Sequence, residues 1–146
     1  MKKKIRQFIV TSSSKKQANL ITNHLFPKIN PFDFIIASDD VDSHKPNPMP
    51  YLKAIKLSGI KNLRSIAFED SAQGLKSALQ AKLPTIYIPS NIPTPIDKDI
   101  KMHCHLDSLG DEFYKTKVIK GPILDNQYVD CSYLDKFLKT ISYAKN

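Results

Sequence analysis

Residues 65–80 read SIAFEDSAQGLKSALQ, and this stretch decides the expected fold. An apolar run over 65–68 ends at two adjacent carboxylates, Glu69 and Asp70, which favours a short buried strand with a polar end. Ser71 then stands where a helix N-cap is expected, and apolar residues follow it at helical spacing. The stretch therefore predicts a strand, a polar turn and a helix.

The same alternation of apolar strands and amphipathic helices recurs along the chain. Continuous apolar strands separated by helices indicate a parallel sheet with helices on both sides, which is an α/β, Rossmann-like class. The carboxyl ends of such strands share one edge, where ligands bind. The expected strands cover 5–11, 32–37, 65–68 and 85–88, and the expected helices cover 14–25, 48–58 and 71–83.

The periodic signal weakens after Pro89. A short strand and turn are expected over 103–109, and a capping box at Ser132 opens a further helical pattern. We therefore expect a core domain over residues 1–110 and a C-terminal helical extension over 111–146 that packs on it.

Composition excludes several classes of protein. The 146 residues are 41% hydrophobic and 25% charged, as in an ordinary globular domain. No apolar run approaches the roughly 20 residues of a membrane span, so no membrane partner is expected. Two cysteines, Cys104 and Cys131, make no disulfide framework, which predicts a reducing, cytoplasmic location.

The net charge is +8, and basic residues crowd the first sixteen positions. This cluster could attract phosphate, nucleic acid or an anionic surface. It is equally typical of a solvated lysine-rich face. Aromatic residues are not interleaved with the lysines as they are in single-strand binders, so the solvated face is preferred and nucleic acid is not the expected partner.

Three segments carry a resemblance to a known family. They are VTSSS at 10–14, SHKPNPMPYLKA at 43–54 and AFEDSAQGLKSALQA at 67–81. In this order they are similar to the second, third and fourth motifs of haloacid dehalogenase (HAD)-type hydrolases, most closely the phosphoglycolate phosphatase and beta-phosphoglucomutase branch. The resemblance implies a partial HAD core and Mg²⁺-dependent hydrolysis of a small phosphorylated molecule.

The resemblance implies a phosphate site built from the first two segments. The hydroxyl of Thr11 or Ser12 would bond a phosphoryl oxygen, and the backbone N–H of Ser13 would add to the anion site. Lys45 would neutralise the phosphate and the nucleophile, so Thr11, Ser12 and Lys45 are the expected catalytic residues. Without the resemblance, these residues would be a strand end, a helix cap and a surface lysine.

The third segment implies a metal site. Asp70 would bind Mg²⁺, and Glu69 would be a second or water-mediated ligand, since hard cations prefer carboxylates and waters. The alternative for Asp70 is a carboxylate placed at a helix N-terminus by the helix dipole.

The family's first motif, an Asp-x-Asp that supplies the nucleophile and general acid, has no room before the strand over 5–11. The substrate-selecting cap that follows it in the family is also absent from this sequence. We therefore expect a truncated core whose sheet contains a gap with unpaired strand edges. Asp40-Val41-Asp42 matches Asp-x-Asp literally, but Asp42 stands only three residues before Lys45, which argues against a nucleophile site.

Two further groups of reactive side chains are weak candidates. His103-Cys104-His105 places two imidazoles on one strand face, but no third ligand follows at zinc spacing. Cys131 has no nearby base, so a thiol nucleophile is not expected.

Three hypotheses for function follow. The preferred one is a phosphatase-type core that is incomplete alone, either a fragment or half of a split enzyme whose partner is a complementary N-terminal fragment. The second is an active phosphatase in which another carboxylate, such as Asp40, replaces the nucleophile. The third is a non-catalytic module that binds phosphorylated ligands or a protein.

Overall fold

The computed structural model describes residues 5–92 and 95–143, and it confirms the α/β class. The strands are β1 (Phe8–Val10), β2 (Phe34–Ile36), β3 (Ala67–Glu69), β4 (Thr85–Tyr87), β5 (Cys104–Leu106) and β6 (Val118–Lys120). The α-helices are α1 (Lys15–Leu25), α2 (Met49–Ser58), α3 (Ala72–Gln80) and α4 (Cys131–Tyr143). Two 3₁₀ helices, η1 (Ser38–Asp40) and η2 (Asn62–Arg64), complete the described elements. The basic residues at positions 2–4 lie outside the described residues.

The strands form two separate sheets. β1 and β2 pair in parallel as a two-stranded sheet, and β3, β4, β5 and β6 follow one another in a second sheet. The expected parallel pairing is therefore confirmed for β1–β2 and β3–β4–β5. The expected gap in the sheet lies between β1 and β3, which belong to different sheets.

β6 was not expected from the sequence. It pairs antiparallel with β5, through Leu106 opposite Val118 and His105 opposite Lys120. Its residues are half-buried or exposed, so the strand carries no apolar run from which periodicity could predict it.

Helix ends follow local side-chain chemistry. Ser14 caps α1 in a capping box with Gln17. Ser71 caps α3 by accepting from the backbone N–H of Gly74 at 3.1 Å. Gly59 ends α2 at φ 66°, a left-handed conformation in which glycine has no steric penalty.

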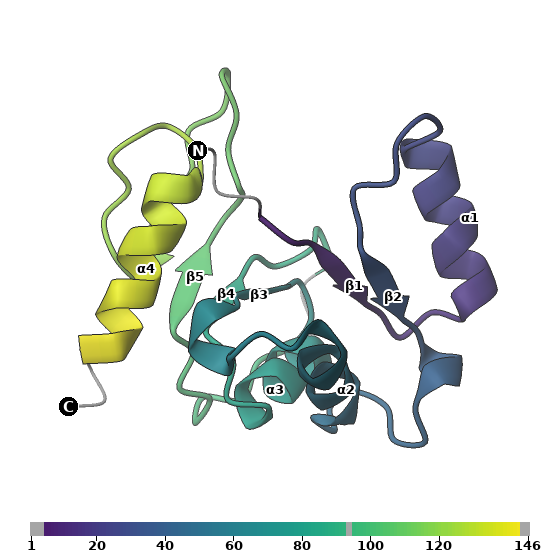
Figure 1. The fold of residues 1–146 in the computed structure, drawn as a ribbon. Helices are drawn as coiled ribbons and strands as arrows, with labels where there is room; N and C mark the ends of the chain where they lie inside the picture. The colour runs from purple at the N-terminus through teal and green to yellow at the C-terminus, as the bar shows by residue number, and fades with distance from the viewer. Residues whose placement is uncertain (1–4, 93–94, 144–146) are drawn as a thin grey trace.

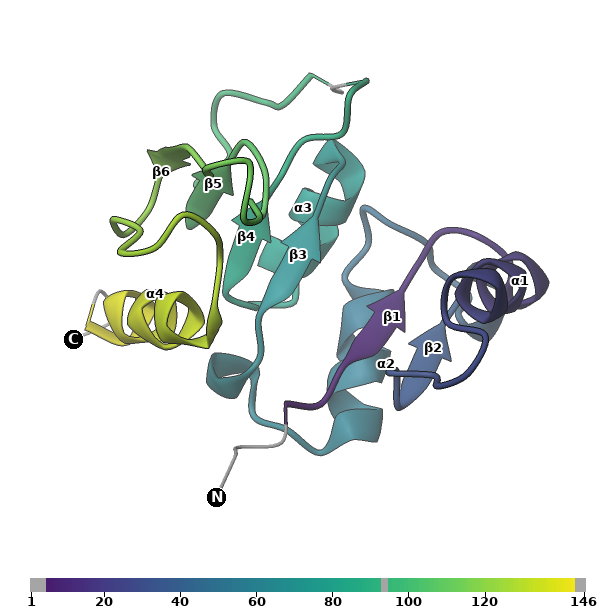
Figure 2. The ribbon, with the colours of Figure 1, turned by 90° about the horizontal axis from the view of Figure 1, so that it is seen from above.

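α4 covers the second sheet, as Figures 1 and 2 show. Phe137 and Tyr133 of α4 pack in one apolar cluster with Ile86 of β4 and with Cys104 and Leu106 of β5. The division into a core over 1–110 and an extension over 111–146 stays a prediction.

α2 joins the two sheets. Tyr51 of α2 packs in a cluster with Ala67 of β3 and with residues of α3, and Val10 of β1 packs against the same cluster. The gap that opens between β1 and β3 is therefore covered on one side by α2. No helix among the described residues has the length and apolar composition needed to cross a membrane.

Replacing Phe137 by alanine tests whether α4 belongs to the core. The ring is fully buried, so we expect Phe137→Ala to lower the free energy of unfolding by about 3–5 kcal/mol in a urea titration. The matched control is Phe113→Ala, whose ring is 93% exposed and whose loss should cost less than about 0.5 kcal/mol. Equal effects of the two substitutions would show that α4 does not stabilise the sheet.

Candidate functional site

The candidate site lies at the carboxyl ends of β1 and β3. The Lys45 ammonium donates to the carbonyl oxygen of Val10, the last residue of β1, at 3.0 Å. It also pairs at 2.5 Å with Oε1 of Glu69, the last residue of β3. One lysine therefore contacts the ends of both sheets, which places these ends at one rim.

The Lys45–Glu69 ion pair is buried. The two side chains are only 8% and 5% exposed. Removing charges from water carries a large penalty that further hydrogen bonds must offset. Tyr51 supplies one, since its hydroxyl donates to Oε1 of Glu69, and its ring lies 5.1 Å from the Lys45 ammonium. Burial and the negative charge of Glu69 raise the pKa of Tyr51 well above its usual range, so the phenol keeps the proton that it donates.

The loop that carries Lys45 is held by α3. The hydroxyl of Ser77 donates to the carbonyl of Asn47 at 2.7 Å, and Asn47 N–H closes a turn onto His44 at 2.9 Å. These bonds anchor both sides of Lys45, which lies between His44 and Asn47. The fixed loop explains how a long, flexible side chain reaches a buried position.

Gly74 makes room for the Glu69 carboxylate. A Cβ built at Gly74 would lie 1.7 Å from Oε2 of Glu69 and 2.3 Å from its carboxyl carbon. The first turn of α3 therefore packs directly on the ion pair, and only glycine fits there.

The predicted phosphate-binding residues follow β1. Thr11 bonds β2 through its backbone N–H, and its hydroxyl accepts from Ser13 N–H at 3.1 Å. Ser13 is tied to the opposite loop because its carbonyl accepts from Ser38 N–H at 3.0 Å. Ser12 is exposed beside them. The three residues thus form one turn at the end of β1, next to the carbonyl that Lys45 binds.

The predicted metal ligands differ in their surroundings. Asp70 is exposed at the rim, whereas Glu69 is 7% exposed and bound by Lys45 and Tyr51. The described residues contain no cluster of three or more His, Cys, Asp or Glu side chains. Mg²⁺ is commonly held by one or two carboxylates with waters and substrate phosphate, so Asp70 alone fits as the exposed protein ligand. The role of Glu69 as a second ligand stays a prediction.

Asp40 has a structural role. Its carboxylate pairs with Lys15 at 2.5 Å and accepts from Ala37 N–H at 2.8 Å, while its carbonyl accepts from Lys53. The hydrogen bonds from Lys15 and Ala37 hold the pKa of Asp40 below its usual range. The sequence reasoning missed the pairing with Lys15, since no local spacing links residues that lie 25 positions apart.

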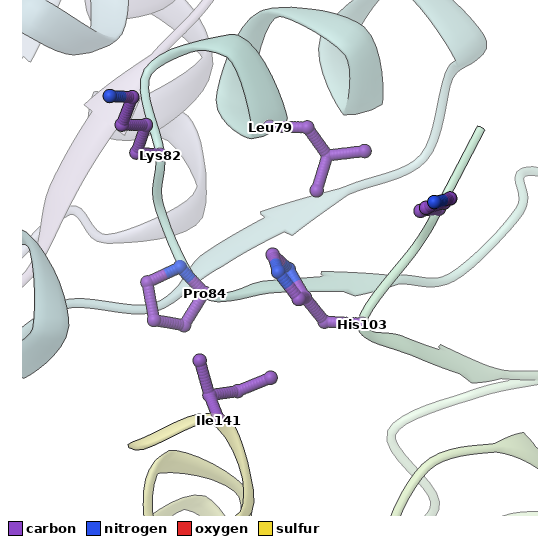
Figure 3. Close-up of a pocket in the computed structure, with 6 residues that line it drawn as sticks. Leu79, Lys82, Pro84, His103 and Ile141 are labelled. Atoms are coloured by element: carbon purple, nitrogen blue, oxygen red, sulfur yellow. The ribbon is translucent and has the colours of Figure 1, made fainter. Parts of the chain in front are cut away.

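The weak metal candidate at His103-Cys104-His105 is not supported as a cluster. Cys104 is fully buried, and its sulfur lies 3.4 Å from the hydroxyl of Tyr133. His103 lines a separate cavity of about 230 Å³ with Leu79, Lys82, Pro84 and Ile141 (Figure 3). Pro84 and His103 directly precede β4 and β5, so this cavity lies at the amino ends of the strands, opposite the candidate site.

The comparisons with known proteins establish the family. The sequence profile of the haloacid dehalogenase-like hydrolases matches residues 1–88 of the 146, which is more than half of the chain. The chain therefore belongs to the haloacid dehalogenase-like hydrolases, as the three motifs predicted.

Individual relatives agree with this assignment. Protein CbbY of Rhodobacter capsulatus is 34% identical over 88 residues, which cover 59% of this chain and 39% of CbbY. The crystal structure of CbbY from Rhodobacter sphaeroides in complex with phosphate is 29% identical, with a TM-score of 0.63 over 71% of this chain and 47% of that one. A beta-phosphoglucomutase from Clostridium difficile supports the fold alone, with a TM-score of 0.68 at 19% identity over 95% of this chain and 51% of that one. The chain thus spans about half the length, or less, of these relatives.

Gly74→Ala tests the packing of α3 on the ion pair. Helix propensity alone would make alanine stabilising by about 1 kcal/mol. The overlap with Glu69 should reverse the sign, and we expect a loss of about 1–3 kcal/mol in the free energy of unfolding. Gln73→Ala, an exposed neighbour on α3, is the control and should change stability little. A stabilised Gly74→Ala protein would contradict the contact.

Asp40→Asn tests the structural role of Asp40 through pH. A carboxyl whose pKa is lower in the folded than in the unfolded state stabilises the fold above the unfolded pKa, and this contribution is lost as the pH falls through the folded value. The stability difference between wild type and Asp40→Asn should therefore be largest at neutral pH and shrink below the ordinary pKa of 3.8. Urea titrations across this range measure it. The control is Asp42→Asn, at an exposed position. An equal loss of stability in the two variants would show that Asp40 has no special structural role.

Proposed function

We propose that this chain supplies the phosphate-binding and magnesium-binding part of a phosphomonoester phosphatase site. The observation that carries the proposal is the Lys45 ammonium held at the carboxyl ends of β1 and β3, beside the turn at Thr11. The end of β1, the loop that carries Lys45 and the end of β3 are distant in sequence but meet at this point. Catalysis of phosphoryl transfer consists mostly of positioning and charge stabilisation, which such a meeting point can supply.

Each residue has a defined part in the proposal. The hydroxyls of Thr11 and Ser12 donate to phosphoryl oxygens, and Lys45 neutralises their charge. The N–H of Ser13, which donates to the Thr11 hydroxyl in the structure, turns to the phosphate when it binds. Asp70 holds Mg²⁺, with Glu69 orienting Lys45 and acting as a further or water-mediated ligand. Mg²⁺, when bound, supplies positive charge opposite the phosphoryl oxygens.

The proposal includes a dependence on a carboxylate from outside the described residues. The nucleophile that the family resemblance implies is an aspartate, and the carboxylate near Lys45 among the described residues is Glu69, which its own hydrogen bonds occupy. Asp40 is occupied by Lys15. On this basis the chain binds phosphate but does not hydrolyse the ester unaided.

The substrate class is a small phosphorylated molecule. CbbY from Rhodobacter sphaeroides has been solved with phosphate and, as a variant, with xylulose-1,5-bisphosphate, which supports a phosphate ester as ligand of this chain. A cytoplasmic location is part of the proposal, supported by two cysteines that are free thiols. The second candidate function is a non-catalytic phosphate-binding module. It is favoured by the ion pairs of Glu69 with Lys45 and of Asp40 with Lys15, which engage both carboxylates.

Binding of inorganic phosphate with Mg²⁺, followed by calorimetry, tests the site. We expect Lys45→Met to weaken phosphate binding roughly tenfold to hundredfold, because a charge-assisted hydrogen bond contributes about 1.5–3 kcal/mol. The control is Lys56→Met, an exposed lysine on α2. A urea titration of each variant separates lost binding from lost folding, since Lys45→Met also leaves Glu69 without its partner.

The outcome that contradicts the proposal is equal phosphate affinity in the Lys45→Met and Lys56→Met proteins when both are folded. Hydrolysis is read separately with p-nitrophenyl phosphate. Turnover by this chain that disappears in Asp40→Asn would instead favour the hypothesis in which Asp40 replaces the nucleophile.

A further inference from the structure

We infer that the cavity at the amino ends of β4 and β5 binds a small organic anion, which carries a negative group on an apolar body. We call this cavity the basic cavity. Its volume is about 230 Å³, and it lies at the end of the second sheet opposite the rim that holds Lys45. It is lined by Leu79, Lys82, Pro84, Lys101, His103 and Ile141.

The charged groups of the basic cavity are all of one sign. Lys82 lies between α3 and β4, and Lys101 lies in the loop before β5, so the two ammonium groups come from separate segments. Among the described residues, no acidic side chain lines the cavity, and neither lysine forms a salt bridge. Two cations without a compensating carboxylate create a positive potential at the cavity, which favours an anion.

Lys82 is held in a conformation that glycine usually adopts. Lys82 N–H donates to Leu79 at 2.9 Å, and Leu83 N–H donates to Ala78 at 3.1 Å, which is the Schellman pattern at the end of α3. Lys82 has φ 58°, in the left-handed region where a Cβ is crowded by the backbone. A lysine here carries a steric penalty that glycine avoids. Such strain concentrates at functional sites, which supports a binding role for the Lys82 side chain.

The walls of the basic cavity are apolar and fixed in place. Leu79 comes from α3 and Ile141 from α4, and Figure 3 shows them on opposite sides of the His103 ring. Thr85 N–H donates to Nδ1 of His103 at 3.3 Å, which holds the ring against the start of β4. Pro84 is fully buried beside it. An apolar wall beneath charged groups suits an organic anion better than an inorganic one.

The basic cavity is separate from the candidate site. β4 runs from Thr85, next to the cavity, to Tyr87, which pairs in register with Glu69 at the opposite end. α3 likewise extends from Gly74, which packs on Glu69, to Leu79 at the cavity. Binding at the two places can therefore be detected at different residues, and the inference does not rest on the proposed phosphatase function.

Binding of benzoate to the full chain, followed by two-dimensional NMR, tests the inference. We expect the amide signals of Lys82, Thr85 and His103 to shift, and those of Thr11 and Asp70 to stay in place. Benzamide has the same ring without the charge, and acetate has the charge without the ring. Each should bind more weakly than benzoate by about a factor of three or more, because one of the two contributions is lost.

Three substitutions of Lys82 separate its charge from its backbone conformation. Lys82→Met removes the charge and should weaken benzoate binding by about a factor of three, whereas Lys82→Arg should retain it. Lys82→Gly should weaken binding as much as Lys82→Met does and also raise the urea midpoint, because glycine removes the steric penalty. The matched control is Lys56→Met, at an exposed lysine on α2, which should bind benzoate like the wild type.

Several outcomes would overturn the inference. They are equal affinity for benzoate and benzamide, equal benzoate affinity of folded Lys82→Met and Lys56→Met proteins, and a lowered urea midpoint in Lys82→Gly. Amide shifts confined to Thr11 and Asp70 would also overturn it, because they would place the anion at the candidate site. Failure of phosphate binding with the benzoate shifts intact would instead contradict the proposed function and leave the basic cavity standing.

Discussion

The buried ion pair between Lys45 and Glu69 is the constraint on which the rest of the structure depends. Two charges with less than a tenth of their side chains exposed require close mutual contact and further hydrogen-bond partners. Val10 and Tyr51 are those partners, and they come from β1 and α2. Removing one charge of such a pair typically costs about 3–5 kcal/mol, because the other stays buried without compensation. The pair therefore ties the loop before α2 to the ends of both sheets.

The same pair explains how two sheets remain in one structure without pairing along their facing edges. α2 contacts β1 and packs with β3 through Tyr51, and Lys45 closes the rim above it. In the gap between β1 and β3, below this rim, Phe68 is 44% exposed and Phe8 is half-buried.

Several features could be predicted because they depend on neighbours in sequence. The strand, carboxylate turn and capped helix at 65–80 follow from apolar periodicity and an N-cap serine, and the structure places β3 and α3 there. The parallel pairing and the expected gap also follow from the order of motifs. β6 could not be predicted, since its exposed residues carry no periodic pattern. The occupation of Asp40 by Lys15 could not be predicted either, since it joins residues far apart in the chain.

By itself, the sequence determined the α/β class, the family and the order of the motif residues, because local propensity and motif spacing are properties of contiguous residues. Only the tertiary structure decided what these residues contact. It buried Glu69 against Lys45, Tyr51 and Gly74, left Asp70 exposed, and gave Asp40 a structural partner. Burial and ion pairing depend on which strands and helices pack together in space. This packing buries Glu69 and leaves Asp70, the next residue, exposed.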